Sequence, residues 1–329
     1  MSTPCAPPNI RLMRRPPIKT LPLANGRSLL VEVWGDPPRD GGSHAVTGRV
    51  DHVALLSDLH VAGNSQIEIS GINPSGHLEG VLQQWLLLPP MRPDYVLIAG
   101  DSAMIAGWEQ DYRQLASLLA LLDDIDLPWH SILGNHDCRE NFGTLFGGRS
   151  PAQPDLPGQQ VGVIDTPMAT WLMLDTLDQV NEVPGQLGED QGRWLGEVLA
   201  ALPDPDKPIL VMGHHNLQFD PDDEKWFGLK DSDVLVKLLD ADPRVKAYVH
   251  GHSHRWQVGQ RESGLWQVSL PALSFAFSEE QPIGWVQARI GGHGMDLQLH
   301  PLRDNGAAGI VNPDPATTAT PPALSLRWR

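Results

Sequence analysis

Short apolar runs that each end in a cluster of Asp, Asn and His residues most restrict how this chain can fold. The clearest example is the run 129–133, which leads into Gly134-Asn135-His136-Asp137. Glycine permits a sharp turn there, and side chains at the carboxyl ends of strands in open α/β sheets face the ligand crevice. Four further clusters show the same pattern: Asp58-Leu59-His60, Gly100-Asp101, Gly213-His214-His215 and Gly251-His252-Ser253-His254. We therefore expect five strand ends to converge on one site.

Strand-like and helix-like patterns alternate through both halves of the chain, as judged from apolar runs and from apolar residues at helical spacing. The expected strands are residues 28–34, 53–57, 95–99, 129–133, 160–165, 170–175, 209–212, 245–249, 256–258, 265–270, 285–290 and 295–300. The expected helices are residues 76–88, 108–122, 141–146, 189–202 and 233–239. The first two strands of the second half, 160–165 and 170–175, suggest a hairpin, and the strands from 256 onward suggest an antiparallel run. This order predicts an α/β fold, a four-layer α/β/β/α sandwich.

One domain with additional terminal segments is the expected organisation. A chain of 329 residues can bury a sizeable apolar core. We place the domain at residues 50–302, after an N-terminal arm, strand and linker at 1–49 and before a mobile tail at 303–329 rich in Ala, Thr and Pro. The first 27 residues, rich in Pro and basic residues, could be an ordered arm or a disordered tail.

Charge and composition exclude several classes of protein. The formal net charge is -16 and the sequence pI is near 5.1, which argues against an extended nucleic-acid surface. Any anion-binding site must therefore be local. Bound metal ions would supply the positive charge that such a site needs. Two cysteines, Cys5 and Cys138, indicate free thiols in a reducing compartment. Because no secretory signal or membrane-length apolar run is visible, we expect a soluble, cytoplasmic protein without membrane contact.

The polar clusters together contain a mixed nitrogen and oxygen ligand set without thiolate. Asp58 and His60 lie two residues apart, so in an extended chain both side chains can point the same way. Asp101 adds an oxygen that can bridge two cations. Such a set suits Mn and/or Fe, and Zn or Co also accept it. The seven candidate ligands are Asp58, His60, Asp101, Asn135, His214, His252 and His254.

Seven ligands exceed the ~4 of a mononuclear zinc site, which predicts two metal ions ~3.5–4 Å apart. We assign one ion to Asp58, His60, His254 and shared Asp101. We assign the other ion to Asp101, Asn135, His214 and His252. A water that bridges the ions would lose its proton near neutral pH and attack phosphorus, while the ions clamp the phosphoryl oxygens.

The neighbours of these ligands are candidates for catalysis and substrate binding. His136 is placed to protonate the leaving-group oxygen as a general acid. Asp137 could orient that imidazole or accept backbone donors at the turn. His215 could line a phosphate pocket or hydrogen-bond a neighbouring loop. Arg139 could contact phosphate bidentately, or it could pair with Glu140 or with Asp137.

Each of these residues also has a simpler interpretation when taken alone. A single His is more often a satisfied turn or core residue than a ligand, and Asp58 alone could cap a helix. Buried carboxylates and imidazoles need partners, however, and a metal pair would satisfy the whole set at once. Most Trp residues are expected to pack in the core, whereas Trp226, in the acidic stretch 221–226, could belong to a lid or an interface.

The five motifs, in this order, resemble those of the calcineurin-like metallophosphoesterase superfamily: D-x-H, G-D, G-N-H-D, G-H-H and G-H-x-H. The resemblance covers residues 50–300. Within the superfamily the chain is most similar to class III cyclic-nucleotide phosphodiesterase-like proteins, judged by the D-x-H motif, Arg139 and the His-His pair. The resemblance implies two mixed sheets with helices outside and the same roles for the seven ligands and His136. The stretch 100–104 lacks the tyrosine of purple acid phosphatases, so an iron-tyrosinate is not expected.

These features predict a dinuclear metal-dependent phosphoesterase that hydrolyses a phosphodiester, either cyclic-nucleotide-like or another small diester. A diester is favoured because the metal motifs contain no Lys or Arg to neutralise the extra charge of a monoester. The alternatives are a phosphomonoesterase for a nucleotide or sugar phosphate and a catalytically silent scaffold. All ligands and His136 are present, which disfavours the scaffold. The expected partner is a small phosphoester that contacts Asn135, His215 and Arg139; the sequence predicts no oligomeric state.

Overall fold

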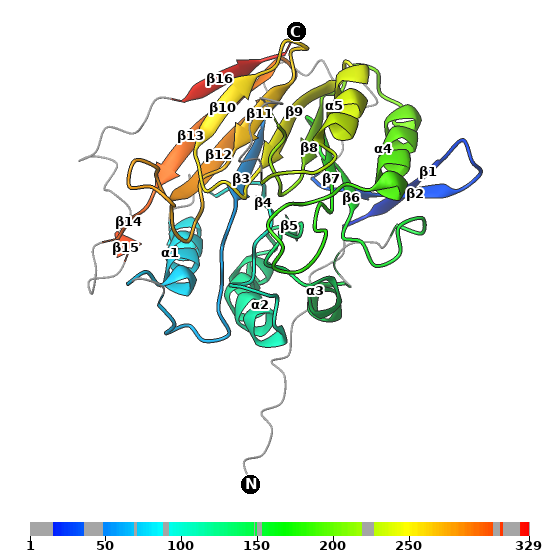
Figure 1. Cartoon of the computed structure of the whole chain (residues 1–329). Helices are drawn as coiled ribbons and strands as arrows, with labels where there is room; N and C mark the ends of the chain where they lie inside the picture. Colours follow the sequence, from blue (N-terminus) through cyan, green and yellow to red (C-terminus); the bar gives the residue numbers. More distant parts are fainter. Residues whose placement is uncertain are drawn as a thin grey trace.

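Two β-sheets packed face to face form the centre of the protein (Figure 1). The computed structural model describes residues 16–35, 49–68, 71–87, 92–147, 149, 153–218, 227–304, 310–311 and 323–328. Within these ranges, an eight-stranded sheet, a six-stranded sheet and a small two-stranded sheet are flanked by five helices.

The eight-stranded sheet has the order β1-β2-β6-β7-β8-β9-β11-β10. Its strands are β1 (Ile18–Pro22), β2 (Ser28–Val33), β6 (Gly162–Asp165), β7 (Thr170–Met173), β8 (Ile209–Met212), β9 (Val245–His250), β10 (Gln257–Gln260) and β11 (Trp266–Ser269). Strands β7, β8, β9 and β11 run parallel to one another, whereas β6 and β7 form the predicted antiparallel hairpin. The sheet is therefore mixed.

The six-stranded sheet has the order β16-β13-β12-β3-β4-β5 and is also mixed. Its strands are β3 (Asp51–Leu56), β4 (Tyr95–Ile98), β5 (Trp129–Ser131), β12 (Gly284–Gly291), β13 (Gly294–Pro301) and β16 (Leu324–Arg327). Strands β3, β4 and β5 are parallel, and β12 pairs antiparallel with β3. A separate pair, β14 (Arg303–Asp304) and β15 (Ile310–Val311), lies beside α1.

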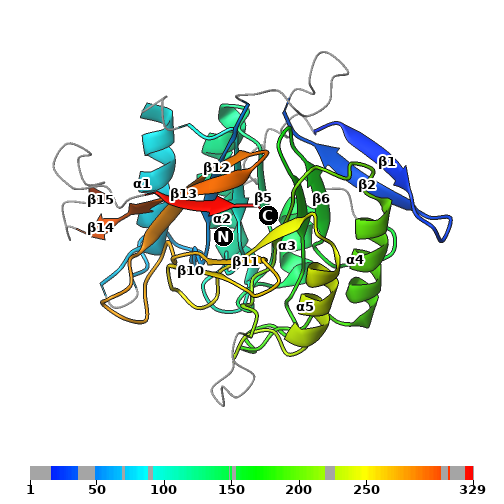
Figure 2. The same cartoon turned by 90° about the horizontal axis from the view of Figure 1, so that it is seen from above.

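Helices cover the outer faces of both sheets. The helices are α1 (Pro74–Leu87), α2 (Glu109–Asp124), α3 (Arg139–Phe146), α4 (Glu189–Ala201) and α5 (Ser232–Ala241). One apolar cluster joins α1, α2 and α3 to the six-stranded sheet, and another joins α4 and α5 to the eight-stranded sheet. Figure 2 shows α1 on one side of the molecule and α4 and α5 on the other. This arrangement confirms the predicted four-layer α/β/β/α sandwich.

Strand β3 shows why the central strands are apolar without alternation. Val53 and Leu55 pack in the cluster between the two sheets, while Ala54 and Leu56 pack against the helices of the outer layer. Successive side chains of a strand point to opposite faces, so a strand buried on both faces must be apolar throughout. The same rule accounts for the short apolar runs that mark the parallel strands.

Two expectations about strand pairing and chain ends need correction. The strands after residue 256 do not form one antiparallel run, because β11 pairs parallel with β9 and the β12–β13 hairpin belongs to the other sheet. The predicted mobile tail does not extend through Leu324–Arg327, since β16 pairs with β13. Strand β1 was not predicted. The division of the chain into one domain and two terminal segments stays a prediction.

The remaining expectations concern the two cysteines, Trp226 and membrane contact. Cys138 is a free thiol, whereas Cys5 and Trp226 lie outside the described residues. None of the helices in the described ranges combines the length and the apolar character needed to cross a membrane. The cytoplasmic location stays a prediction.

Candidate metal centre

All seven predicted ligands follow the carboxyl ends of parallel strands, at the edge where the two sheets meet. Loops after β3, β4 and β5 carry four of them, and loops after β8 and β9 carry the other three. Backbone hydrogen bonds hold these loops together: the Asp58 amide donates to the Gly100 carbonyl at 3.1 Å, and the Gly251 amide donates to the His214 carbonyl at 3.1 Å. The Ser274 amide, beyond β11, donates to the Asp58 carbonyl at 3.2 Å and links the two sheets.

The side chains of the seven residues form one unbroken series of close contacts. The first half runs from Asp58 Oδ1 to His254 Nε2 (3.2 Å), then to His60 Nε2 (3.3 Å) and to Asp101 Oδ2 (3.8 Å). The second half runs from Asp101 Oδ2 to His214 Nε2 (3.3 Å), then to Asn135 Oδ1 (3.2 Å) and to His252 Nδ1 (3.0 Å). Asp101 thus lies between the two predicted ligand sets, in the position of a bridging carboxylate.

Backbone carbonyl groups determine which nitrogen of each imidazole faces the centre. His60 Nδ1 lies 3.1 Å from the Met104 oxygen, and His214 Nδ1 lies 2.7 Å from the Ala99 oxygen. His252 Nε2 lies 2.9 Å from the Phe227 oxygen, and His254 Nδ1 lies 2.6 Å from the Phe275 oxygen. A carbonyl oxygen only accepts, so each of these nitrogens carries the hydrogen and the opposite nitrogen turns a lone pair inward.

Electron-rich atoms therefore converge on this site without a matching number of donors. In neutral rings, the inward nitrogens of His60 and His254 are both acceptors, yet they lie 3.3 Å apart. The Asn135 oxygen also faces two inward nitrogens. Such an arrangement is costly in a buried site unless cations supply the missing positive charge. The residues present thus fit a divalent metal centre, and each His has the backbone partner that commonly orients a metal ligand.

Five of the seven candidate ligands adopt a left-handed backbone conformation. Asp58, His60, Asp101, His252 and His254 have φ values of 52°, 46°, 48°, 66° and 50°. Non-glycine residues rarely occupy this region, and such strain gathers at functional sites. We expected Asp58 and His60 to point the same way because the chain would be extended there, and this reason was wrong. Their side chains converge because the chain coils tightly after β3, not because it stays extended.

Glycines in the motifs allow the loops to approach one another. A Cβ at Gly134 would collide with the Asp101 carboxylate, and a Cβ at Gly251 would collide with the Ser57 hydroxyl and the Asp58 carboxylate. The Ser57 hydroxyl donates to Asp58 Oδ2 at 2.6 Å. The glycines of the G-N-H-D and G-H-x-H motifs are thus required by close packing at the centre.

Burial and neighbouring charges shift the pKa values of the carboxylates and imidazoles in the centre. Burial opposes ionisation of Asp58, but the His254 and His214 imidazoles outweigh it and lower the pKa of Asp58 to about 2. Burial likewise opposes protonation of His214 and His254, but Asp101 raises the pKa of His214 to about 9 and Asp58 raises the pKa of His254 above its usual value. With no cation bound, protons on these rings therefore supply the positive charge that the centre needs, and a metal ion would replace them. Burial lowers the pKa of His60 to about 4, despite the attraction of Asp101. The carboxylates are therefore held ionised, and the site attracts positive charge.

His136 lies beside the ligands and is partly open to solvent. Its backbone amide donates to Asp101 Oδ1 at 2.8 Å, and its Nδ1 lies 2.7 Å from the Ile105 carbonyl oxygen. Its ring meets that of His60 edge to face, with 5.2 Å between the ring centroids. The ring is thus held at the open side of the centre.

The buried Asp137 carboxylate is surrounded by hydrogen-bond donors from three backbone amides and one tyrosine. Its carboxylate accepts the backbone amides of Gly134 (2.9 Å), Ala103 (3.0 Å) and Ser102 (3.1 Å), together with the Tyr112 hydroxyl (3.0 Å). Of the two roles left open by the sequence, these contacts agree with the acceptor of backbone donors. Burial raises the pKa of Asp137 to about 6.

His215 is fully buried, and its Nδ1 pairs with the Thr176 hydroxyl at 2.8 Å. Thr176 follows β7, so this contact agrees with the alternative that His215 binds a neighbouring loop. One ring nitrogen of His215 also lies within 4.8 Å of ring nitrogens of His214 and His252. A contact between His215 and substrate stays a prediction.

Arg139 pairs with a carboxylate that the sequence did not indicate. Its Nε and Nη2 donate to Asp175 Oδ2 and Oδ1 at 2.8 and 2.9 Å, and Nη2 also donates to the Leu177 carbonyl. The predicted partners, Glu140 and Asp137, are therefore not the ones observed. Asp175 ends a predicted strand just as Asp58 does, and this pattern could have revealed it.

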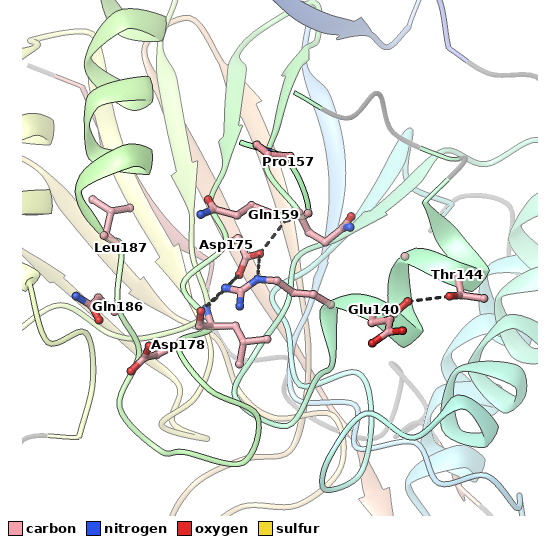
Figure 3. Close-up of a pocket in the computed structure, with 14 residues that line it drawn as sticks. Glu140, Thr144, Pro157, Gln159, Asp175, Asp178, Gln186 and Leu187 are labelled. Carbon is pink, nitrogen blue, oxygen red and sulfur yellow. Dashed lines mark hydrogen bonds and ion pairs between the residues drawn. The ribbon is translucent and has the colours of Figure 1, made fainter. Parts of the chain in front are cut away.

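The ion pair lies in a pocket of about 810 Å³ whose lining includes none of the seven candidate ligands. Figure 3 shows Glu140 and Thr144 on one side of this pocket and Gln186 and Leu187 on the other, with Asp175 between them. The Asp175 carboxylate binds the guanidinium of Arg139 bidentately in this pocket. A contact between Arg139 and a phosphate stays a prediction.

Fold and site together define a metal-dependent phosphoric ester hydrolase with a divalent metal centre. Residues 52–256 match the family described as calcineurin-like phosphoesterase, and the chain belongs to this family. This membership agrees with the resemblance found in the motifs.

Three proteins that are similar to this chain are named as phosphodiesterases or as a phosphatase. A probable cyclic nucleotide phosphodiesterase of Pseudoalteromonas sp. is 26% identical over 237 residues, which cover 71% of this chain and 82% of that protein. The 3′,5′-cyclic adenosine monophosphate phosphodiesterase CpdA of Pseudomonas aeruginosa is 26% identical over 245 residues, covering 71% and 82%. A dimetal phosphatase structure from Danio rerio superposes with a TM-score of 0.60 at 16% identity, covering 85% of this chain and 99% of that one.

Proposed function

We propose that this protein hydrolyses a small phosphodiester, cyclic-nucleotide-like or otherwise, with two divalent metal ions bound by the seven ligands and with His136 as the general acid. The observation that carries the proposal is the convergence of inward lone pairs, exemplified by His60 Nε2 and His254 Nε2 at 3.3 Å. Manganese and/or iron suit this nitrogen and oxygen set, and zinc or cobalt also fit it.

The chain's own residues would divide the work as follows. Asp58, His60 and His254 would hold one ion, Asn135, His214 and His252 would hold the other, and Asp101 would be shared between them. When bound, the ions lower the pKa of water and stabilise charge on the phosphoryl group. His136 Nδ1 is occupied by the Ile105 carbonyl, so its Nε2 remains to deliver a proton to the leaving oxygen.

A diester is favoured over a monoester by the charges around the site. A monoester carries an additional negative charge, and the metal motifs provide no Lys or Arg to bind it. Arg139, the candidate that the sequence suggested, is bound to Asp175. The relatives from Pseudoalteromonas sp. and Pseudomonas aeruginosa, both named as cyclic nucleotide phosphodiesterases, support the same choice.

The test is a comparison of initial rates at saturating manganese. Bis-p-nitrophenyl phosphate and 3′,5′-cyclic AMP represent diesters, and p-nitrophenyl phosphate and 5′-AMP represent monoesters. The Asp101→Ala variant provides the background for each substrate. We expect kcat/KM to be higher for the diesters by at least about tenfold, equivalent to ~1.4 kcal/mol in the barrier. Higher values for both monoesters would establish the alternative, a phosphomonoesterase.

A further inference from the structure

Most of the exposed large apolar side chains in the described part of the chain lie on loops at the edge of the sheets that carries the metal centre. Ten large apolar residues are exposed among the described residues, and three of them, Ile18, Val234 and Leu324, lie on β1, α5 and β16. The other seven lie on loops that follow β3, β4, β7, β8 and β11 at the same edge of the sheets. Clustered exposed apolar groups generally mark a binding surface.

Phe277 is the most exposed of these residues, with 72% of its surface open to solvent. Its ring stacks on the imidazole of His254, with 4.2 Å between the centroids and 16° between the planes. His254 Nε2 in turn faces Asp58 at 3.2 Å inside the centre. Phe277 therefore forms an aromatic wall directly on a candidate metal ligand.

A second ring keeps Phe277 in this orientation. Phe275 meets it edge to face, with centroids 5.8 Å apart, and also packs against His254 at 4.8 Å and His60 at 5.1 Å. One face of Phe277 is thus covered by His254, and the other remains open. A flat, open, oriented ring is a stacking platform of the kind that binds a nucleobase.

We propose that the open face of Phe277 stacks on the planar base of a nucleotide-derived phosphodiester whose phosphate lies at the metal centre. This inference rests on the proposed phosphodiesterase function and specifies its substrate class. Base–aromatic stacking needs only a π-face and no hydrogen bond from the protein, which is what Phe277 offers. The neighbouring carboxylates of Glu279 and Glu280 are exposed and disfavour an anionic group at this position.

A quaternary ammonium group, such as that of a choline diester, is the main competing occupant of an aromatic site. Recognition of such a cation commonly uses several rings that enclose it. Phe277 forms an open group with Phe275 and His254. Phe227, the other exposed phenylalanine among the described residues, packs on His252 in the second half of the centre. The geometry therefore favours a flat neutral group over a cation.

The test compares two cyclic diesters that differ only at the sugar C1′ position. These are 3′,5′-cyclic AMP and methyl riboside 3′,5′-cyclic phosphate, which lacks the base. Phe277→Ala removes the ring, Phe277→Leu keeps apolar bulk without a flat face, and Val234→Ala on α5 is the matched surface control. Metal content is measured for each variant, because Phe277 contacts His254.

We expect both Phe277 variants to raise KM for 3′,5′-cyclic AMP by about fivefold to tenfold, with kcat and metal content unchanged. KM for the base-free diester should stay within about twofold of the wild-type value, as should both constants in Val234→Ala. This pattern would support stacking of the base.

Three other results would overturn the inference. Equal losses on both substrates, or loss of metal, would mean that Phe277 only supports His254. Unchanged constants in both variants would mean that the ring does not contact the substrate. Preferential hydrolysis of glycerophosphocholine by the wild type would point to a cation. In each case hydrolysis of a diester would leave the proposed function standing, whereas no hydrolysis of any diester would refute that function itself.

Discussion

The Nδ1 of His136 lies 2.7 Å from the carbonyl oxygen of Ile105, which leaves only Nε2 of this imidazole free for proton transfer. If His136 is the general acid, His136→Ala should lower kcat by about 10²–10⁴-fold. Metal content should stay at the wild-type level, because His136 is not one of the seven ligands. The measurement is steady-state kinetics together with elemental analysis of the same samples.

The leaving group provides the control for this role. A p-nitrophenolate leaves readily without a proton, whereas the alkoxide of a cyclic nucleotide or an alkyl diester needs one. The loss in His136→Ala should therefore be smaller for bis-p-nitrophenyl phosphate than for 3′,5′-cyclic AMP. Equal losses on both substrates would show that His136 does not act as an acid.

Asp137 should prove to be a stabilising residue. Asp137→Ala leaves the amides of Ser102, Ala103 and Gly134 without their acceptor, and we expect the free energy of unfolding to fall by about 3 kcal/mol. Tyr112→Phe, which removes one donor to the same carboxylate, should cost about 1 kcal/mol. Urea denaturation measures both. A large loss of kcat in Asp137→Ala at unchanged stability would instead favour the alternative that Asp137 orients His136.

The pair of Arg139 and Asp175 should behave as a structural contact. Arg139→Met leaves Asp175 buried without its partner, and we expect a loss of about 2 kcal/mol, reduced from the fully buried case because the Arg139 side chain is 32% exposed. KM for the diester should change by less than about twofold. Conversely, a tenfold rise in KM at unchanged stability would establish the phosphate contact that the sequence suggested.

The protein should lose stability in mild acid, partly through His300. This residue stacks on Trp285 with 4.2 Å between ring centroids, and burial lowers its pKa from 6.5 to about 4. The unfolded chain therefore gains a proton near pH 6.5 that the folded protein gains only near pH 4. The stability contributed by neutral His300 is complete above pH 6.5 and is lost as the pH falls toward 4.

The shift of the His300 pKa corresponds to at most ~3 kcal/mol. In His300→Gln, the free energy of unfolding should fall less steeply between pH 6.5 and 4 than in the wild type, whatever the absolute stability of the variant. Urea denaturation at several pH values measures this slope. Identical slopes would show that His300 titrates normally in the folded protein.

Much of the fold was predictable because the parallel strands are buried on both faces. Runs such as 95–99 and 209–212 are apolar throughout, and the clusters that end them indicate where the loops begin. Pairing partners were harder to predict. Strand β11 has the local pattern of an antiparallel strand but pairs parallel with β9, because packing across the whole sheet decides this choice.

At the site, the sequence motifs identified the seven candidate ligands, and the side chains of these residues are in contact in the structure. It could not reveal how the chain brings them together, since the left-handed conformation of Asp58 and His60 has no signature in the sequence. It also missed contacts between distant segments. Asp175 binds Arg139, and Phe277 covers His254. The residues of each pair are too far apart in the sequence for a local pattern to indicate the contact.

The central claim is that acids and imidazoles from both sheets hold two metal ions that the reaction requires. Its most direct test is elemental analysis of the purified protein, combined with the diesterase rate before chelation, after chelation and after manganese is added back. We predict about two ions per chain in the wild type, few in Asp101→Ala, and a rate that is lost and recovered with the metal. A metal-stripped sample that keeps its full rate would contradict the claim.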